Sequence, residues 1–194
     1  IEEEREEDIL KVGGVVHTDL YSSVINTTKS RFSWLFVNLL TAIIASIVIA
    51  FFQASIEKVV ALAVLMPIVA SMGGNAGTQT LTVSVRALAT KELTPSNALK
   101  IIGKETFVGG INGFIFAFFL GVIAGLWFND YMLGYVISLS MIINLIIAGF
   151  AGTFIPLTLN KLKIDPALAS GVILTTITDV IGFLSFLGLA TLVL

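Results

Sequence analysis

The sequence predicts an all-α integral membrane protein with five transmembrane helices per subunit. Of its 194 residues, 56% are hydrophobic and 12% are charged, and the mean hydropathy is +0.99. A soluble domain carries about 25% charged residues, so the composition excludes that class. Apolar stretches that can cross a bilayer, which takes about 17–25 residues, fall at 33–52, 59–88, 106–128, 134–160 and 166–194.

The chain is expected to divide into two parts, a cytoplasmic lead-in at 1–31 and a five-helix membrane domain at 32–194. The lead-in is polar and acidic. A weakly amphipathic helix is predicted from Glu2 to Val12, because Gly13 and Gly14 follow it as a stop signal. Two interpretations stay open: a solvated linker, or a helix that contacts the cytoplasmic mouth of the bundle.

Basic residues in the short loops predict the orientation in the cell membrane, since such residues collect on the cytoplasmic side. Lys58 falls on one side of the predicted bundle, whereas the opposite side collects Arg5, Lys11, Lys29, Arg31, Arg86, Lys91, Lys100, Lys104, Lys161 and Lys163. The protein is therefore expected to be a multi-pass membrane protein, with the amino terminus in the cytoplasm and the carboxyl terminus outside.

The second span combines a proline with glycines and amides. Pro67 removes a backbone donor and is expected to bend the helix. Easy unwinding is predicted at the glycines that follow, Gly73, Gly74 and Gly77. Asn75 and Gln79 are four residues apart and share one helix face. Close helix packing is one interpretation, but the combination with proline, Asn and Gln favours a face that lines a pore.

The third and fourth spans carry fewer signals. A short interfacial helix is predicted at 97–107, capped by Ser96 and Asn97. Glu105 stands where the third span begins; it is either an ordinary interfacial acid or a cation contact. Asn144 in the fourth span is interpreted as a hydrogen-bonding residue between helices. Only residues 161–165 separate the fourth and fifth spans, which predicts a tight antiparallel hairpin.

The fifth span carries an acid near its middle. Asp179 lies in a stretch, 166–194, that is otherwise uncharged. A carboxylate at that depth costs at least ~2.5–3.5 kcal/mol unless something compensates it, and a passing metal ion or proton is the natural candidate. Asp165 is fourteen residues earlier, within about 40° on the helix surface, and also suits a helix cap before Pro166. Leu168, Gly171, Val172, Thr175 and Thr176 lie on or beside this face.

The residue types limit the ion and the chemistry. Cysteine is absent and the one histidine, His17, lies in a polar region, which argues against a soft-metal site. Oxygen ligands suit Mg²⁺, Ca²⁺, Na⁺ or a proton. An intramembrane hydrolase would need a nucleophile with a base or an activated metal, so the chain is not expected to be an enzyme. A purely structural anchor would leave the cost of Asp179 unexplained.

Several motifs, in this order, resemble the MgtE magnesium transporter/channel family. They are Pro67, the run from Met72 to Gln79, Asp165-Pro166-Ala167, and Thr175 to Asp179 followed by Gly182-Phe183, with Arg31 and Trp34 at the entry to the first span. The resemblance covers the whole membrane part. It implies channel-like Mg²⁺ transport by a homodimer in the lipid bilayer, with the second and fifth helices lining a path at the dimer interface.

The resemblance also implies a role for single residues: two copies of Asp179 would face each other and hold a largely hydrated Mg²⁺. Together with the residue pattern, it makes the candidate metal-contacting residues Asp179, Asn75, Gly73, Gly74, Thr175, Gly171, Asp165 and Glu105. Cytosolic regulatory domains are expected upstream, outside this chain, with Glu2–Val12 as the end of their linker helix. The alternative is transport of other divalent cations or cation-coupled exchange. No nucleic-acid partner is expected.

Overall fold

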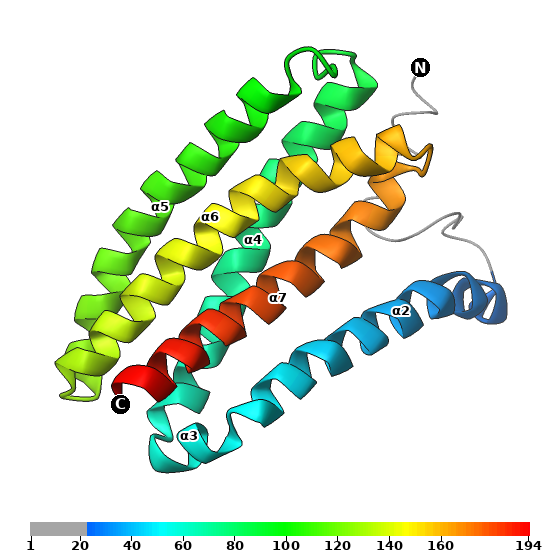
Figure 1. Ribbon diagram of the computed structural model, residues 1–194. Coiled ribbons are helices and arrows are strands. Elements are labelled where there is room, and N and C mark those ends of the chain that lie inside the picture. Colours follow the sequence, from blue (N-terminus) through cyan, green and yellow to red (C-terminus); the bar gives the residue numbers. More distant parts are fainter. Residues whose placement is uncertain (1–22) are drawn as a thin grey trace.

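A computed structural model describes residues 23–194, and all regular structure in that range is helical. The helices are α2 (Val24–Phe51), α3 (Gln53–Lys58), α4 (Ala61–Ala89), α5 (Ala98–Trp127), α6 (Tyr131–Lys161) and α7 (Pro166–Val193) (Figure 1). Five of these helices, all but α3, are long and apolar enough to span a membrane. The predicted fold class is confirmed over this range, whereas the helix predicted at Glu2–Val12 lies outside the described residues.

Helix α6 lies at the centre of the bundle. It packs against α5 on one side and against α4 and α7 on the other, and α4 and α7 also pack against each other (Figure 1). Helix α2 contacts mainly α7 and leans away from the bundle toward its own amino-terminal end. Its one buried residue is Ala45. The large apolar residues of α2 are exposed over most of its length, as expected of a helix surrounded by lipid.

Glycines bring α5 and α6 into backbone contact. A methyl group on Gly109 would collide with the carbonyl oxygen of Leu145, and one on Gly134 would lie 2.5 Å from the carbonyl oxygen of Gly121. Such close approach gives extensive van der Waals contact, which holds helices together where lipid removes the hydrophobic difference between inside and outside. The hairpin of α5 and α6 is therefore the tightest part of the bundle.

The helix starts follow the capping chemistry only in part. The Asp165 carboxylate accepts a hydrogen bond from the N–H of Ala167 (3.0 Å), and Pro166 takes the first helical position of α7; the predicted cap is confirmed. At the start of α5, Asn97 makes no side-chain cap. Its Oδ1 instead accepts from the N–H of Thr94 (2.9 Å), inside the preceding turn.

The observed helices differ from the predicted elements in three places. The first helix begins at Val24, so the expected division at 31/32 falls inside α2. The short polar helix α3 was not predicted. The interfacial helix expected at 97–107 is continuous with the third span as α5, because no proline separates them and Gly103 costs a helix only about 1 kcal/mol relative to alanine.

The predicted unwinding of the second span is also wrong. Helix α4 is continuous from Ala61 to Ala89 and contains Pro67. Two of its glycines are buried against neighbours, since a methyl group on Gly73 would lie 2.8 Å from Asn144 Cγ and one on Gly77 3.0 Å from Leu174 Cδ1. These glycines permit close packing, and the packed neighbours keep the helix intact.

The basic loops gather at one end of the bundle. The α4–α5 loop and the α6–α7 loop lie at one end of the bundle, opposite α3 and the carboxyl terminus, and the amino-terminal end of α2 projects away from the bundle on the same side (Figure 1). The positive-inside pattern is therefore consistent with the fold. Which compartment this end faces stays a prediction.

Candidate functional site

Helices α4 and α7 pack antiparallel in a regular register. A methyl group on Gly77 would lie 3.0 Å from Leu174 Cδ1, and one on Gly182 would lie 3.3 Å from Val69 Cγ1. The two contact residues of α4, Val69 and Gly77, are eight residues apart, and so are those of α7, Leu174 and Gly182. The two helices therefore run in step past each other, and each residue of α7 has a definite counterpart in depth on α4.

This register places the deep acid of α7 at the level of the glycine motif of α4. Asp179 is five residues beyond Leu174 and so lies level with Met72, beside Gly73. The Asp179 side chain is half-buried. Among residues 23–194 it has neither a hydrogen bond nor an ion pair. Within residues 23–194 the carboxylate thus has no protein partner, although it lies in the middle of an apolar helix.

One face of α4 is open and polar. Between positions 71 and 82, every exposed residue is polar, namely Ser71, Asn75, Thr78, Gln79 and Thr82. Asn75 Nδ2 donates to Ser71 Oγ (3.3 Å), so the amide oxygen of Asn75 is not used in that hydrogen bond. A methyl group on Gly74 would meet nothing within 4 Å. Five polar side chains facing lipid would be costly, so this face needs water, ions or another polar surface.

Thr175 and Gly171 border Asp179 on α7, and both are half-buried. Thr175 Oγ1 donates within its own helix, to the carbonyl oxygens of Gly171 and Val172 (3.1 Å each). Because the hydroxyl proton is used there, the lone pairs of the same oxygen point away from the helix backbone and can accept a hydrogen bond from water. Thr175 stands one helical turn before Asp179, in a position to contact the hydration shell of an ion.

Three of the predicted site residues are not placed to contact an ion beside Asp179. Asp165 caps α7 about 21 Å away along the helix axis. Gly73 is buried against Asn144 and so is a packing position. Glu105 lies on α5, with a side chain that is 16% exposed and 3.5 Å from the ammonium of Lys104. Since α6 separates α5 from α4 and α7, Glu105 and Asp179 do not meet within one chain.

Sequence reasoning missed part of the open α4 face. Ser71, Thr78 and Thr82 were not singled out, although polar residues at 71, 75, 78 and 82 repeat with the period of a helix and could have been recognised as one stripe. The role predicted for Asn144 is confirmed: its Nδ2 donates to the carbonyl oxygen of Val69 on α4 (2.9 Å).

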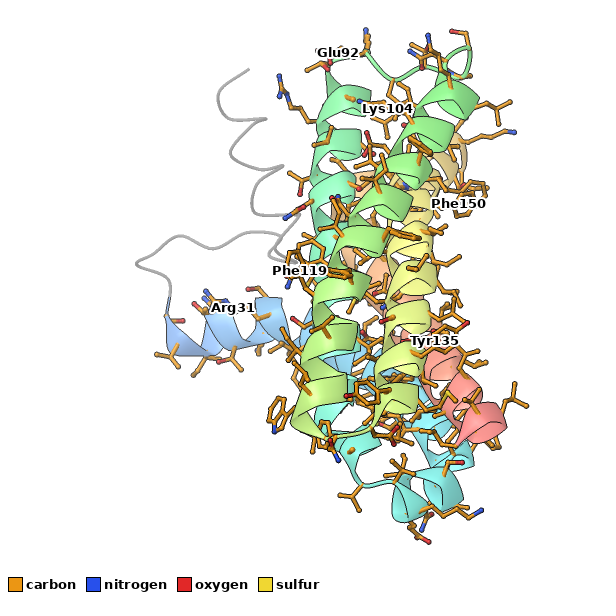
Figure 2. All side chains as sticks on the ribbon, turned by 90° about the vertical axis from the view of Figure 1, so that its left-hand side faces the viewer. Arg31, Glu92, Lys104, Phe119, Tyr135 and Phe150 are labelled. Carbon is orange, nitrogen blue, oxygen red and sulfur yellow. The ribbon has the colours of Figure 1, made fainter. Side chains whose placement is uncertain are left out.

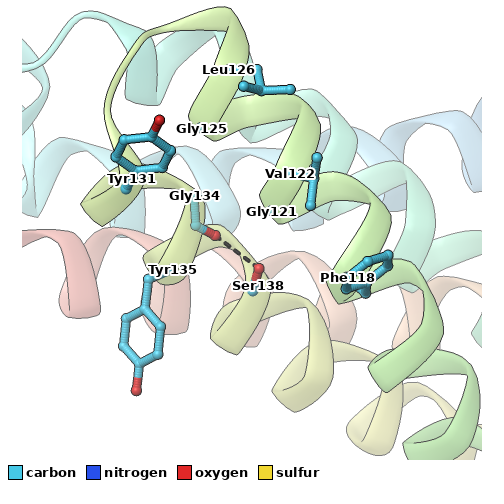
Figure 3. A pocket seen from close by; sticks show the side chains of 9 residues that line it. All are labelled: Phe118, Gly121, Val122, Gly125, Leu126, Tyr131, Gly134, Tyr135 and Ser138. Atoms are coloured by element: carbon cyan, nitrogen blue, oxygen red, sulfur yellow. Dashed lines mark hydrogen bonds between the residues drawn. The ribbon is translucent and has the colours of Figure 1, made fainter.

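A groove of about 300 Å³ between α5 and α6 lies elsewhere (Figure 3). Its lining includes the apolar side chains of Phe118 and Val122 and the ring of Tyr131. Ser138 lies on its wall, with its hydroxyl donating to the carbonyl oxygen of Gly134 (2.8 Å). None of the lining residues is charged, so this groove does not suit a cation, and the polar face of α4 with Asp179 remains the candidate site.

Comparison with known proteins identifies the family. Residues 66–189, which contain most of α4 and α7 and all of α5 and α6, match the model of a family described as MgtE, divalent cation transporter. The chain belongs to the MgtE family. The members of this family are ion transporters, so the expectation that the chain is not an enzyme is confirmed.

Three curated MgtE relatives are similar over most of the chain. The magnesium transporter MgtE of Bacillus subtilis is 36% identical over 161 residues, 83% of this chain and 36% of that protein. The magnesium transporter MgtE of Thermus thermophilus is 34% identical over 197 residues, 100% of this chain and 44% of that protein. The magnesium transporter MgtE of Enterococcus faecalis is 30% identical over 192 residues, 99% of this chain and 42% of that protein. The chain thus spans less than half the length of these relatives.

Proposed function

We propose that this chain is the membrane part of a magnesium transporter and that the ion passes along the open faces of α4 and α7. The observation that carries the proposal is the carboxylate of Asp179, which has no partner among residues 23–194 and lies level with a polar stripe on the neighbouring helix. Membership of a divalent cation transporter family and similarity to three magnesium transporters support the choice of ion.

The residues of the candidate site suit a hydrated Mg²⁺ ion. Mg²⁺ dehydrates reluctantly and usually keeps several waters, binding proteins through one or two carboxylates. One chain offers Asp179 as the carboxylate and the Asn75 amide oxygen, with Thr175 Oγ1 as a possible acceptor from the hydration shell. Within the described residues, no group of three or more His, Cys, Asp or Glu side chains could hold a metal ion. A hydrated ion fits this sparse set better than a bare one.

The functional unit is a homodimer with the path between its subunits. A single chain supplies one deep carboxylate, which only half neutralises a doubly charged ion. Two copies joined through α4 and α7 would bring two Asp179 side chains together and would also cover the polar stripe from Ser71 to Thr82, which lipid cannot solvate. Conduction is channel-like in this arrangement, because waters of the ion rather than fixed ligands contact the protein.

The remaining features of the proposal concern the surroundings of the path. Residues 32–194 form the transport domain and 1–31 the cytoplasmic lead-in, with the amino terminus in the cytoplasm and the carboxyl terminus outside. The end of the bundle that carries the basic loops then faces the cytoplasm. The relatives are more than twice as long as this chain, and regulatory domains upstream are proposed as partners of the lead-in.

The alternative is transport of another divalent cation, or exchange coupled to a second cation. The family description, divalent cation transporter, is broad enough to include the first. Uptake of Mg²⁺ into liposomes in the presence of Ca²⁺, Mn²⁺ or Co²⁺, with and without a Na⁺ or proton gradient, separates these options. A rate that depends on the gradient favours exchange.

The decisive experiment is Mg²⁺ uptake into liposomes by the wild type and Asp179→Asn. The amide keeps the size and removes the charge, so uptake should fall to background. Asp130→Asn is the matched control: it makes the same change in an acid of the α5–α6 loop, and asparagine retains the cap that Asp130 provides for Met132 and Leu133. Wild-type uptake by Asp179→Asn would move the site to Asp165 or Glu105.

Binding to the same carboxylate should depend on pH. Protons and metal compete for a carboxylate, so metal affinity falls as pH falls. We expect the thermal stabilisation by Mg²⁺ to be smaller at pH 5 than at pH 7 in the wild type, and to be small at both pH values in Asp179→Asn. An unchanged Mg²⁺-dependent shift in the variant would show that another group binds the ion.

A further inference from the structure

Asn144 is the polar side chain at the point where α4, α6 and α7 meet. It is fully buried on α6. Its Nδ2 donates across the interface to the carbonyl oxygen of Val69 on α4 (2.9 Å). Because hydrogen bonds weaken steeply away from their preferred direction, this bond fixes both the distance and the rotation of α6 relative to α4.

The same amide occupies notches made by glycines on two helices. A methyl group on Gly73 would lie 2.8 Å from Asn144 Cγ, and one on Gly182 would lie 2.8 Å from Asn144 Nδ2. Both distances are shorter than real contacts of a Cβ atom. The amide of Asn144 therefore fits only where both α4 and α7 present a glycine, and it contacts the two helices at the same level.

The side chain of Asn144 has a destabilising feature that its packing does not explain. Its Oδ1 is buried and accepts no hydrogen bond within residues 23–194. A buried acceptor without a partner destabilises a protein, and an apolar side chain of the same shape avoids that cost. A leucine at this position would fill a similar space between the two glycines. An unsatisfied polar group at the centre of a bundle indicates a role other than stability.

We infer that Asn144 is a positioning residue for transport, which holds the glycine motif of α4 and the Asp179 segment of α7 in register. Gly73 is two residues before Asn75, and Gly182 is three residues after Asp179. A shift of either helix against Asn144 moves these groups relative to each other. The inference rests on the proposed function, since it assumes that the ion passes beside Asn75 and Asp179.

The first test separates positioning from stability. In Asn144→Leu the unsatisfied acceptor is gone, so the thermal unfolding temperature should be unchanged or higher. The Mg²⁺ uptake rate should nevertheless fall by about tenfold to a hundredfold, the loss that a misplacement of about 1 Å causes. The matched control is Ser140→Ala, another fully buried polar residue of α6, whose hydroxyl donates within the helix to Ile137. Its uptake should stay at the wild-type rate.

The second test uses the fit of the amide against glycine. Gly182→Ala places a methyl group against Asn144 and should slow uptake, and Asn144→Ala in the same chain removes the obstruction. We expect the double variant to transport faster than Gly182→Ala alone, because residues in contact couple by about twofold to a hundredfold. If the losses of uptake rate in Gly182→Ala and Asn144→Ala simply add in the double variant, the inference is overturned. This outcome can be measured even if Asn144→Leu does not fold.

A third measurement reports the distance between α4 and α7 directly. The chain has no cysteine, so Val83→Cys on α4 and Leu184→Cys on α7, both exposed, can carry a pair of spin labels. The distance distribution should broaden or shift in Asn144→Leu and stay unchanged in Ser140→Ala. An unchanged distribution together with wild-type uptake in Asn144→Leu would refute positioning.

The two proposals fail in different ways. If Asp179→Asn transports like the wild type, the path lies elsewhere and the proposed function fails. If Asp179→Asn is inactive while Asn144→Leu and Ser140→Ala are equally active, the path stands and only the inference about Asn144 fails.

Discussion

The outward faces of α4 and α5 differ in chemistry. Gly73 of α4 packs on Asn144 of α6, and Gly109 of α5 packs on the next residue, Leu145. From this level the polar stripe of α4, Ser71 to Thr82, runs toward the α4–α5 loop, whereas α5 runs in the opposite direction from Gly109. On α5, every exposed residue from Phe107 to Trp127 is apolar except Asn112; Figure 2 shows Phe119 on this surface.

The contrast identifies what each face contacts. An apolar helix face is at no disadvantage in lipid, whereas exposed amides and hydroxyls at membrane depth need polar surroundings. The two faces overlap in depth near Gly73 and Gly109, where Ser71 and Asn75 are exposed on α4 and Phe107, Val108 and Ile111 are exposed on α5. The α5 face is therefore the lipid-facing side, and the α4 face is turned to the proposed path. The first two predictions below compare positions on these two faces, and the third compares the two sides of α5.

The largest expected difference is in access by water. Single cysteines at Asn75 and Thr78 should react with a charged, membrane-impermeant thiol reagent, while cysteines at Phe107 and Ile111 should stay unmodified, because a thiol in lipid is shielded from water and reacts poorly. The absence of native cysteine gives a clean background. Mass spectrometry of the labelled protein in liposomes measures the modified fraction. Equal labelling of the two pairs would remove the distinction between the faces.

The next largest effect concerns an added charge. Ser71 and Ile111 lie at about the same level, since Ser71 is two residues before Gly73 and Ile111 two residues after Gly109. Ile111→Asp should destabilise the protein by about 2.5–3.5 kcal/mol, the cost of a carboxylate at bilayer depth. Ser71→Asp should cost much less and should strengthen stabilisation by Mg²⁺. Thermal unfolding with and without Mg²⁺ measures both, and similar losses in the two variants would count against the path.

A smaller effect distinguishes the two sides of α5 itself. Gly109→Ala pushes a methyl group into the backbone of α6 and should destabilise the bundle by about 1–3 kcal/mol. Gly103→Ala meets nothing within 4 Å and should instead stabilise α5 by about 0.5–1 kcal/mol through helix propensity. Chemical unfolding in detergent measures both. A neutral Gly109→Ala would mean that α5 and α6 separate more easily than their contact indicates.

Much of the fold could be predicted because its signals are local. Apolar length alone locates five spans, and a carboxylate without a neighbouring cation marks Asp179 whatever the fold. The cap at Asp165 follows from Asp before Pro, a short-range pattern that the structure confirms. The signals failed at α4, where proline and glycine predicted a broken helix and packing kept it whole.

The sequence by itself therefore determined the membrane class, the number of spans, the gathering of basic loops at one end and the identity of the deep acid, because each depends on residues close together in the chain. Only the tertiary structure decided which glycine does what. Gly73 is buried against Asn144, while Gly74, its neighbour, is open. Adjacent residues on a helix point about 100° apart, and the positions of α6 and α7 determine which direction is covered. The same neighbours give Asn144 its contact with two helices at once.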